Sequence, residues 1–126
     1  MTGSLTEQTA GTAYETVCRL DDIELERGVA ALVRGEAIAI FRTHDGNVYA
    51  TSNYDPCSGA SVLARGIVGT RGSASGDIPV VASPMHKQVF DLRTGQCLDD
   101  AAVRVPTYEV VVDAGQVRVG GPRESP

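Results

Sequence analysis

The sequence has no tryptophan, two histidines and a single lysine, Lys87, among its 126 residues. Positive charge is also scarce: 11 Lys and Arg stand against 16 Asp and Glu, for a formal net charge of −5. Nucleic acids and anionic membrane surfaces both favour basic proteins, so this balance argues against either as a partner. No apolar run approaches the roughly 20 residues of a membrane-spanning helix, which argues against an integral membrane protein.

The cysteine pattern excludes two further classes. Cys18, Cys57 and Cys97 are widely spaced, odd in number and free of any Cys-x-x-Cys pair. This pattern argues against a disulfide framework and against a structural zinc site. Residues 1–13 also lack the apolar centre and cleavage site of a secretory signal. We therefore expect a cytoplasmic protein.

The length and composition predict one domain with two short tails. Hydrophobic residues make up 42% of the chain, enough for a single core at this length. Residues 1–13 and 121–126 are rich in small and polar residues or proline and contain few apolar side chains. Such segments bury too little surface to offset the entropy of ordering. We expect mobile tails at 1–13 and 121–126 around a single domain at 14–120.

Short β-rich runs separated by turn signals dominate the domain. The Asp45-Gly46 pair predicts a hairpin turn, because glycine tolerates the positive φ that such turns need. Residues 53–66 and 69–76 are rich in Gly, Ser or Pro and predict loops. About nine short strands predict an antiparallel β-sandwich or small barrel. The expected strands are 14–20, 28–34, 36–43, 47–51, 67–68, 78–82, 88–92, 108–112 and 116–119, with a loop or helical turn at 21–27.

Two loops carry the spacing that bears on function. Residues 53–60 and 82–87 each hold a proline between candidate ligand positions. The arrangement resembles the Rieske pattern, in which one loop supplies Cys-x-His and the other supplies Cys-x-x-His to an iron–sulfur cluster. The four positions are occupied here by Asp55, Cys57, Ser83 and His86, of which only His86 matches. The pattern is thus a degenerate one.

A longer string of residues resembles one family in particular. Segments 55–63, 65–69, 79–84 and 90–100 are similar to the small subunit of assimilatory NAD(P)H-dependent nitrite reductase. This resemblance implies a Rieske-like β-sandwich with two apposed loops on a smaller lobe and no cluster. It also implies a non-catalytic role beside a large subunit that carries FAD, a [4Fe–4S] cluster and sirohaem and reduces nitrite to ammonium.

Ligand chemistry agrees with the expected absence of a cluster. Asp55 and Ser83 would replace two thiolates by hard oxygen groups, which suit iron–sulfide poorly. We therefore expect no catalytic, cofactor-binding or metal-binding residue in this chain. Three alternatives remain at this point: a free Rieske-type electron carrier with unusual ligands, a stand-alone binding module, and a mononuclear metal site built from Asp55, Cys57 and His86.

Something other than a cluster must then hold the loops together. We expect side-chain hydrogen bonds from Asp55 and Ser83, with His86 as a further candidate, because short polar side chains readily bond loop backbone. We interpret Cys57 as an ordinary loop cysteine, and Cys18 and Cys97 as small hydrophobes. Apolar and cationic side chains near these loops suit a protein interface, so our hypothesis is that the loop tip docks on the large subunit. The alternative is that Val62 and Leu63 simply pack beneath the loop. The interface residues are Val62, Leu63, Arg65, Met85 and Lys87.

Overall fold

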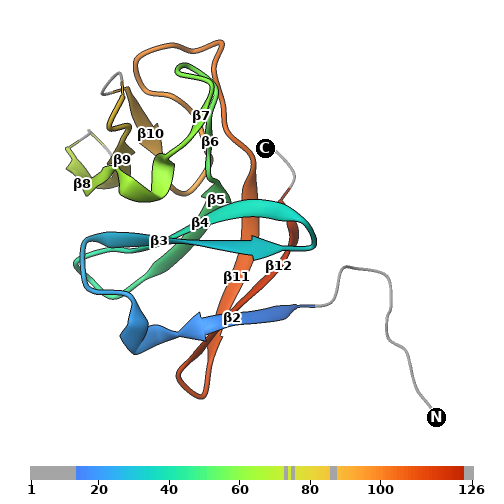
Figure 1. The fold of residues 1–126 in the computed structure, drawn as a ribbon. Helices are drawn as coiled ribbons and strands as arrows, with labels where there is room; N and C mark the ends of the chain where they lie inside the picture. The colour runs from blue at the N-terminus through green and yellow to red at the C-terminus, as the bar shows by residue number, and fades with distance from the viewer. Residues whose placement is uncertain (1–13, 73, 75, 86–87, 124–126) are drawn as a thin grey trace.

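The computed structural model describes residues 14–72, 74, 76–85 and 88–123. It is an all-β protein with a six-stranded base sheet and a smaller lobe, as expected (Figure 1). Every strand pair among the described residues is antiparallel. In spatial order the base sheet contains β2 (Glu15–Arg19), β12 (Gln116–Pro122), β11 (Thr107–Asp113), β5 (Val48–Ser52), β4 (Glu36–Arg42) and β3 (Arg27–Val33).

The smaller lobe is built from the middle of the chain. Its elements are a three-stranded sheet of β10 (Val89–Asp91), β9 (Ile78–Ala82) and β8 (Ile67–Arg71), a short pair of β6 (Tyr54–Asp55) and β7 (Ala60–Ser61), and the 3-10 turn η2 (Leu63–Arg65). A second 3-10 turn, η1 (Leu20–Asp22), follows β2. The N- and C-terminal strands thus form the base, and the central segment forms the lobe that carries the two loops. Within the described residues no helix is long and apolar enough to cross a membrane.

Strand β4 connects the two halves because it is buried on both faces. Side chains alternate along a strand, so Ile38 and Ile40 enter the core of the base while Ala39 and Phe41 enter the core beneath the lobe. All four side chains are at most 1% exposed. The expected hairpin of β3 and β4 is confirmed, with Val33 opposite Glu36. The Asp45-Gly46 turn is also confirmed, with Gly46 at φ +87°.

Three sequence-based expectations differ from the structure. The expected loops at 53–66 and 69–76 contain β6, β7 and η2 and the end of β8. These strands are too short, or too rich in Gly and Ser, for alternation to be visible. The expected C-terminal tail begins too early, because β12 extends to Pro122 and the Arg123 amide donates to the Thr107 carbonyl at 2.8 Å. The expected tail segments 1–13 and 124–126 lie outside the described residues.

A tight turn after β10 fixes the return of the chain toward the base. The Asp91 carboxylate accepts hydrogen bonds from the Arg93 amide at 2.8 Å and from its guanidinium at 3.0 and 3.1 Å. Gly95 then adopts φ +82°, and a Cβ at this position would lie 2.0 Å from the Val105 carbonyl oxygen. Only glycine satisfies both the positive φ and this close approach.

We predict that Gly95→Ala destabilises the protein much more than Gly115→Ala. Gly115 lies at φ +77°, and a Cβ added there would meet nothing within 4 Å, so its substitution costs only the left-handed backbone, roughly 1–2 kcal/mol. Gly95→Ala adds a clash with backbone and should cost a further ~1–3 kcal/mol. Urea unfolding of both variants measures the difference, and equal losses would contradict the close approach.

Candidate functional site: two loops joined at the tip of the lobe

A direct side-chain hydrogen bond joins the two loops. Asp55 ends β6, and Ser83 follows the last residue of β9. The structure buries both side chains, at 0% and 1% exposure. The Ser83 hydroxyl donates to the Asp55 carboxylate, although 28 positions separate the two residues in sequence. The two residues at the thiolate positions of the Rieske pattern are therefore in contact. The expectation that Asp55 and Ser83 form side-chain hydrogen bonds is confirmed, whereas His86, the further candidate, lies outside the described residues.

The Asp55 carboxylate also holds the beginning of the first loop. It accepts from the Cys57 amide at 2.9 Å and from the Ser58 hydroxyl at 3.0 Å. In the second loop the Ser83 oxygen accepts from the Met85 amide at 3.2 Å. Burial raises the pKa of Asp55, but the hydrogen bonds from Ser83, Cys57 and Ser58 outweigh it, so the pKa lies below its ordinary value. The carboxylate is thus held in its charged form.

Cys57 lies beside this carboxylate and packs against the core of the lobe. Burial raises the pKa of its thiol, and the negative charge of Asp55 raises it further. A thiol with a raised pKa is protonated at neutral pH and is a weak nucleophile. These surroundings support the interpretation of Cys57 as an ordinary loop cysteine rather than a reactive thiol. Cys97 is buried as a small hydrophobe, whereas Cys18 is only partly buried.

Asn53 is a structural residue of the site that the sequence analysis missed. Its side chain is 6% exposed. Its Nδ2 donates to the Ser61 carbonyl at 3.2 Å, and its Oδ1 accepts from the Ala64 amide at 2.8 Å. Its own carbonyl accepts from the Leu63 amide at 3.0 Å. Asn53 therefore fixes the far end of the first loop from inside. The signal was an Asn directly after a strand, but its partners lie 8 to 11 residues away.

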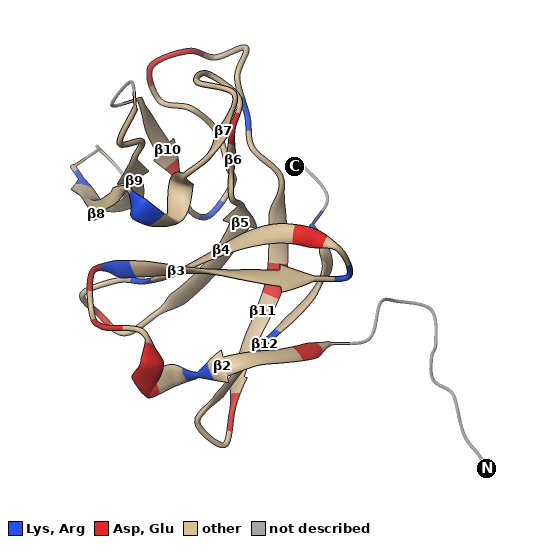
Figure 2. Ribbon diagram, viewed as in Figure 1, with Lys and Arg blue, Asp and Glu red and all other residues tan. Residues whose placement is uncertain are grey.

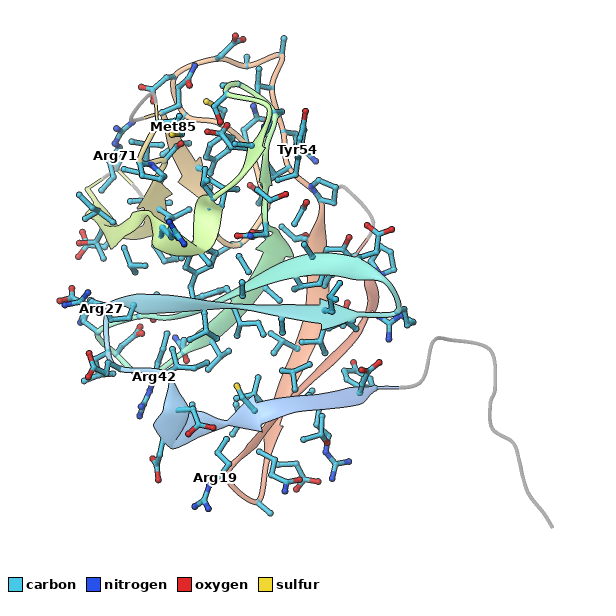
Figure 3. The ribbon with its side chains drawn as sticks, in the orientation of Figure 1. Arg19, Arg27, Arg42, Tyr54, Arg71 and Met85 are labelled. Atoms are coloured by element: carbon cyan, nitrogen blue, oxygen red, sulfur yellow. The ribbon has the colours of Figure 1, made fainter. Side chains whose placement is uncertain are left out.

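The four described residues of the interface hypothesis do not form one surface. Leu63 is fully buried in the core of the lobe. It is wrong as a docking residue, because η2 turns its side chain inward onto Phe41 and its neighbours. Met85 is 56% exposed and lies at the end of the lobe far from the base (Figure 3). Arg65 lines a groove at the opposite side of the lobe, next to β3. Val62 is partly buried, and His86 and Lys87 lie outside the described residues.

The base sheet, the smaller lobe and the two joined loops define a Rieske-like domain. A family profile for the Rieske-like [2Fe-2S] domain matches residues 13–120. The ferredoxin of carbazole 1,9a-dioxygenase from Nocardioides aromaticivorans superposes with a TM-score of 0.71 at 27% sequence identity. That match covers 89% of this chain and all of the ferredoxin.

More similar relatives show to which family of Rieske-like domains the chain belongs. The nitrite reductase (NADH) small subunit of Escherichia coli K12 is 41% identical over 109 residues, which cover 86% of this chain and 97% of the relative. A solved structure from Mycobacterium tuberculosis, provisionally assigned as an NADH-dependent nitrite reductase small subunit, has a TM-score of 0.80 and 42% identity. It covers 91% of this chain and 98% of that one. The chain belongs to the family of nitrite reductase small subunits.

One relative places the same domain inside a longer protein. The nitrite reductase [NAD(P)H] large subunit of Klebsiella oxytoca is 38% identical to this chain over 107 residues. This stretch covers 85% of the chain but only 11% of that large subunit. In that relative, a domain of this kind is therefore part of the same polypeptide as the large subunit.

The residues at the four ligand positions do not fit a Rieske cluster. A Rieske centre needs two thiolates on one iron and two imidazoles on the other. Asp55 and Ser83 offer oxygen atoms, and these atoms are already hydrogen-bonded to each other inside the lobe. Cys57 stands where the first imidazole would be. Within the described part of the chain no three His, Cys, Asp or Glu side chains converge as a metal site would require.

We predict that Asp55→Asn lowers the free energy of unfolding by about 1–3 kcal/mol at neutral pH. The amide loses the charge and directs a donor toward groups that themselves donate. Asp99→Asn is the matched control, because Asp99 is exposed and, among the described residues, accepts one backbone hydrogen bond, from the Val89 amide at 2.8 Å. The control should lose no more than about 1 kcal/mol. Equal losses in urea unfolding would refute a special role for Asp55.

The pH dependence of the same variant provides an internal check. The pKa of Asp55 is lower in the folded protein than its unfolded value of about 3.9, so the charged carboxylate contributes stability above that pH. This contribution is lost as the pH falls through the folded pKa. The stability difference between wild type and Asp55→Asn should be full at pH 7 and shrink below about pH 4. A constant difference down to about pH 3 would contradict a lowered pKa.

Proposed function

We propose that this chain is the non-catalytic small subunit of an assimilatory, cytoplasmic nitrite reductase that reduces nitrite to ammonium with NAD(P)H. The redox cofactors, FAD, a [4Fe–4S] cluster and sirohaem, belong to the large subunit. The hydrogen bond between Ser83 and Asp55 carries the non-catalytic part of this proposal, because it occupies the atoms that would replace the cluster thiolates. The identity to the Escherichia coli small subunit and the domain within the Klebsiella large subunit support the partnership.

An iron assay separates this proposal from a free electron carrier. We expect the purified chain to be colourless and to hold far less than one cluster after anaerobic incubation with iron and sulfide. The physical reason is that thiolates, rather than carboxylate and hydroxyl groups, stabilise an iron–sulfide cluster. A cluster-bearing Rieske ferredoxin treated in parallel shows that the reconstitution works. Stoichiometric iron with a Rieske-type visible spectrum would establish the electron carrier instead.

Association with the large subunit tests the partnership directly. The large subunit of the same organism, expressed alone, should bind the purified chain and regain NAD(P)H-dependent nitrite reduction when the chain is added. No binding and no effect on turnover would favour a stand-alone binding module.

The tip of the lobe is one proposed contact in this complex. We expect the double variant Met85→Ala/Lys87→Glu, shown to be folded, to bind the large subunit more weakly. Met85 offers an exposed apolar side chain, and apolar anchors supply much of the affinity of protein interfaces. Association and turnover equal to those of the wild type would exclude the tip as a contact.

A further inference from the structure

A groove separates the base sheet from the lobe on the side away from the loop tip. Its volume is about 480 Å³. Residues 25–27, at the start of β3, form one wall, and residues 65–68, at the end of η2 and the start of β8, form the other. The groove is therefore built from both halves of the molecule, and a ligand in it would contact both.

Two large apolar side chains in this groove are exposed. Ile67 is 76% exposed and Leu25 is 51% exposed, one on each wall. A single exposed apolar residue needs no explanation. Two that face the same groove provide a place where an apolar side chain of a partner can be buried.

Positive charge accompanies these apolar side chains. Residues 56–90 contain Arg65, Arg71 and Lys87 against the single acidic residue Asp77, although the whole chain has a net charge of −5. Figure 2 shows basic residues on η2, on β8 and at the start of β3, along the same side of the molecule. This stretch therefore carries more positive than negative charge, although Asp55 and Asp91 at its two ends balance it over residues 55–91.

Arg65 is the arginine of the groove that is available to a carboxylate. Arg27 already lies 3.9 Å from Glu24, and Glu26 also lines the groove. Arg65 is exposed and forms no ion pair with any residue that the structure describes, and the same holds for Arg71. The Arg65 guanidinium can therefore bind a carboxylate of a partner without breaking an internal ion pair.

The strands beside the groove favour an extended ligand. β3 and β8 are each at the edge of their sheet. An edge strand presents backbone N–H and C=O groups that have no partner strand on that side. An extended peptide can use such groups while its side chains enter the space between Leu25 and Ile67.

We propose that this groove docks an extended segment of the large subunit, in which an apolar side chain is placed between Leu25 and Ile67 and a neighbouring carboxylate pairs with Arg65. The inference rests on the proposed function, since it assigns a contact surface for that partner. The groove would be a second contact besides the loop tip, on the side of the molecule where the lobe joins the base.

A pair of matched double variants tests the groove. Arg65→Glu/Ile67→Ser changes an exposed arginine and an exposed apolar residue of the groove. Arg19→Glu/Leu32→Ser makes the same changes elsewhere: Leu32 is 70% exposed, and Arg19 lies at the opposite end of the base from the lobe (Figure 3). The groove variant should bind the isolated large subunit about tenfold more weakly or worse. The control variant should stay within about twofold of the wild type.

The outcomes separate this inference from the proposed function. If the wild type and the groove variant bind the large subunit equally well, the groove is not a docking site, but the proposed role as a small subunit stands. Failure of the wild type to bind overturns both. A change in the mass of the chain alone, from dimer to monomer in the groove variant, would assign the groove to a second copy and overturn the inference.

The salt dependence of association gives a second measurement. Pairing between Arg65 and a carboxylate requires that wild-type association slow and weaken as salt is raised. Arg65→Lys should retain this dependence, and Arg65→Glu should lose part of it. Salt-independent association would overturn the acidic character assigned to the partner segment. Thermal melting of each variant confirms that the folded state is being compared.

Discussion

The charged carboxylate of Asp55, fully buried yet hydrogen-bonded from three sides, is the constraint on which the tip of this domain depends. A buried charge is costly unless its hydrogen bonds replace those that water would make. Ser83, the Cys57 amide and Ser58 supply that replacement. One of these donors comes from the other loop, so satisfying the carboxylate also fixes the distance between the loops. Prolines after Asp55 and Ser83 limit the entropy lost when the loops are ordered.

The lobe can hold this arrangement because it is anchored firmly to the base. β4 contributes to both hydrophobic cores, so the lobe cannot move away from the base without exposing Phe41. Asn53 follows the end of β5, and its side chain bonds the Ser61 carbonyl just before η2 and the Ala64 amide within η2. Buried amides with all their partners fixed define a single loop geometry. The positions of the two loops and of the groove beside β3 therefore both depend on how the lobe is attached to the base sheet.

The sequence was sufficient for much of this fold because its local signals agree with one another. The Asp45-Gly46 turn specifies a hairpin without tertiary information. That Asp55 and Ser83 form hydrogen bonds in these loops was predictable from residue type, whereas their direct contact depends on how the two loops pack together. Asn53 could have been singled out as an Asx residue at a strand end, but which backbone groups it bonds depends on the folded loop.

The errors share a different cause: they concern side-chain direction and strand length, which packing decides. Leu63 and Arg65 are two residues apart on one 3-10 turn, and one side chain is buried while the other lines a groove. No composition argument separates them. The strand β12 continues through Gly121 to Pro122 because β11 is there to pair with it. A Gly-Pro sequence has little preference for a strand of its own.

A tip closed by hydrogen bonds has a property that a metal-closed tip lacks. Its shape requires no iron, sulfide or redox state, and with a lowered pKa the Asp55 carboxylate stays charged throughout the neutral range. The surface beside it is therefore present whenever the chain is folded. Such constancy suits a subunit whose task is to bind another protein, because binding loses least entropy when the contact surface is formed in advance. The same reasoning explains how the loop geometry of a redox domain can be retained where the residues no longer suit its cluster.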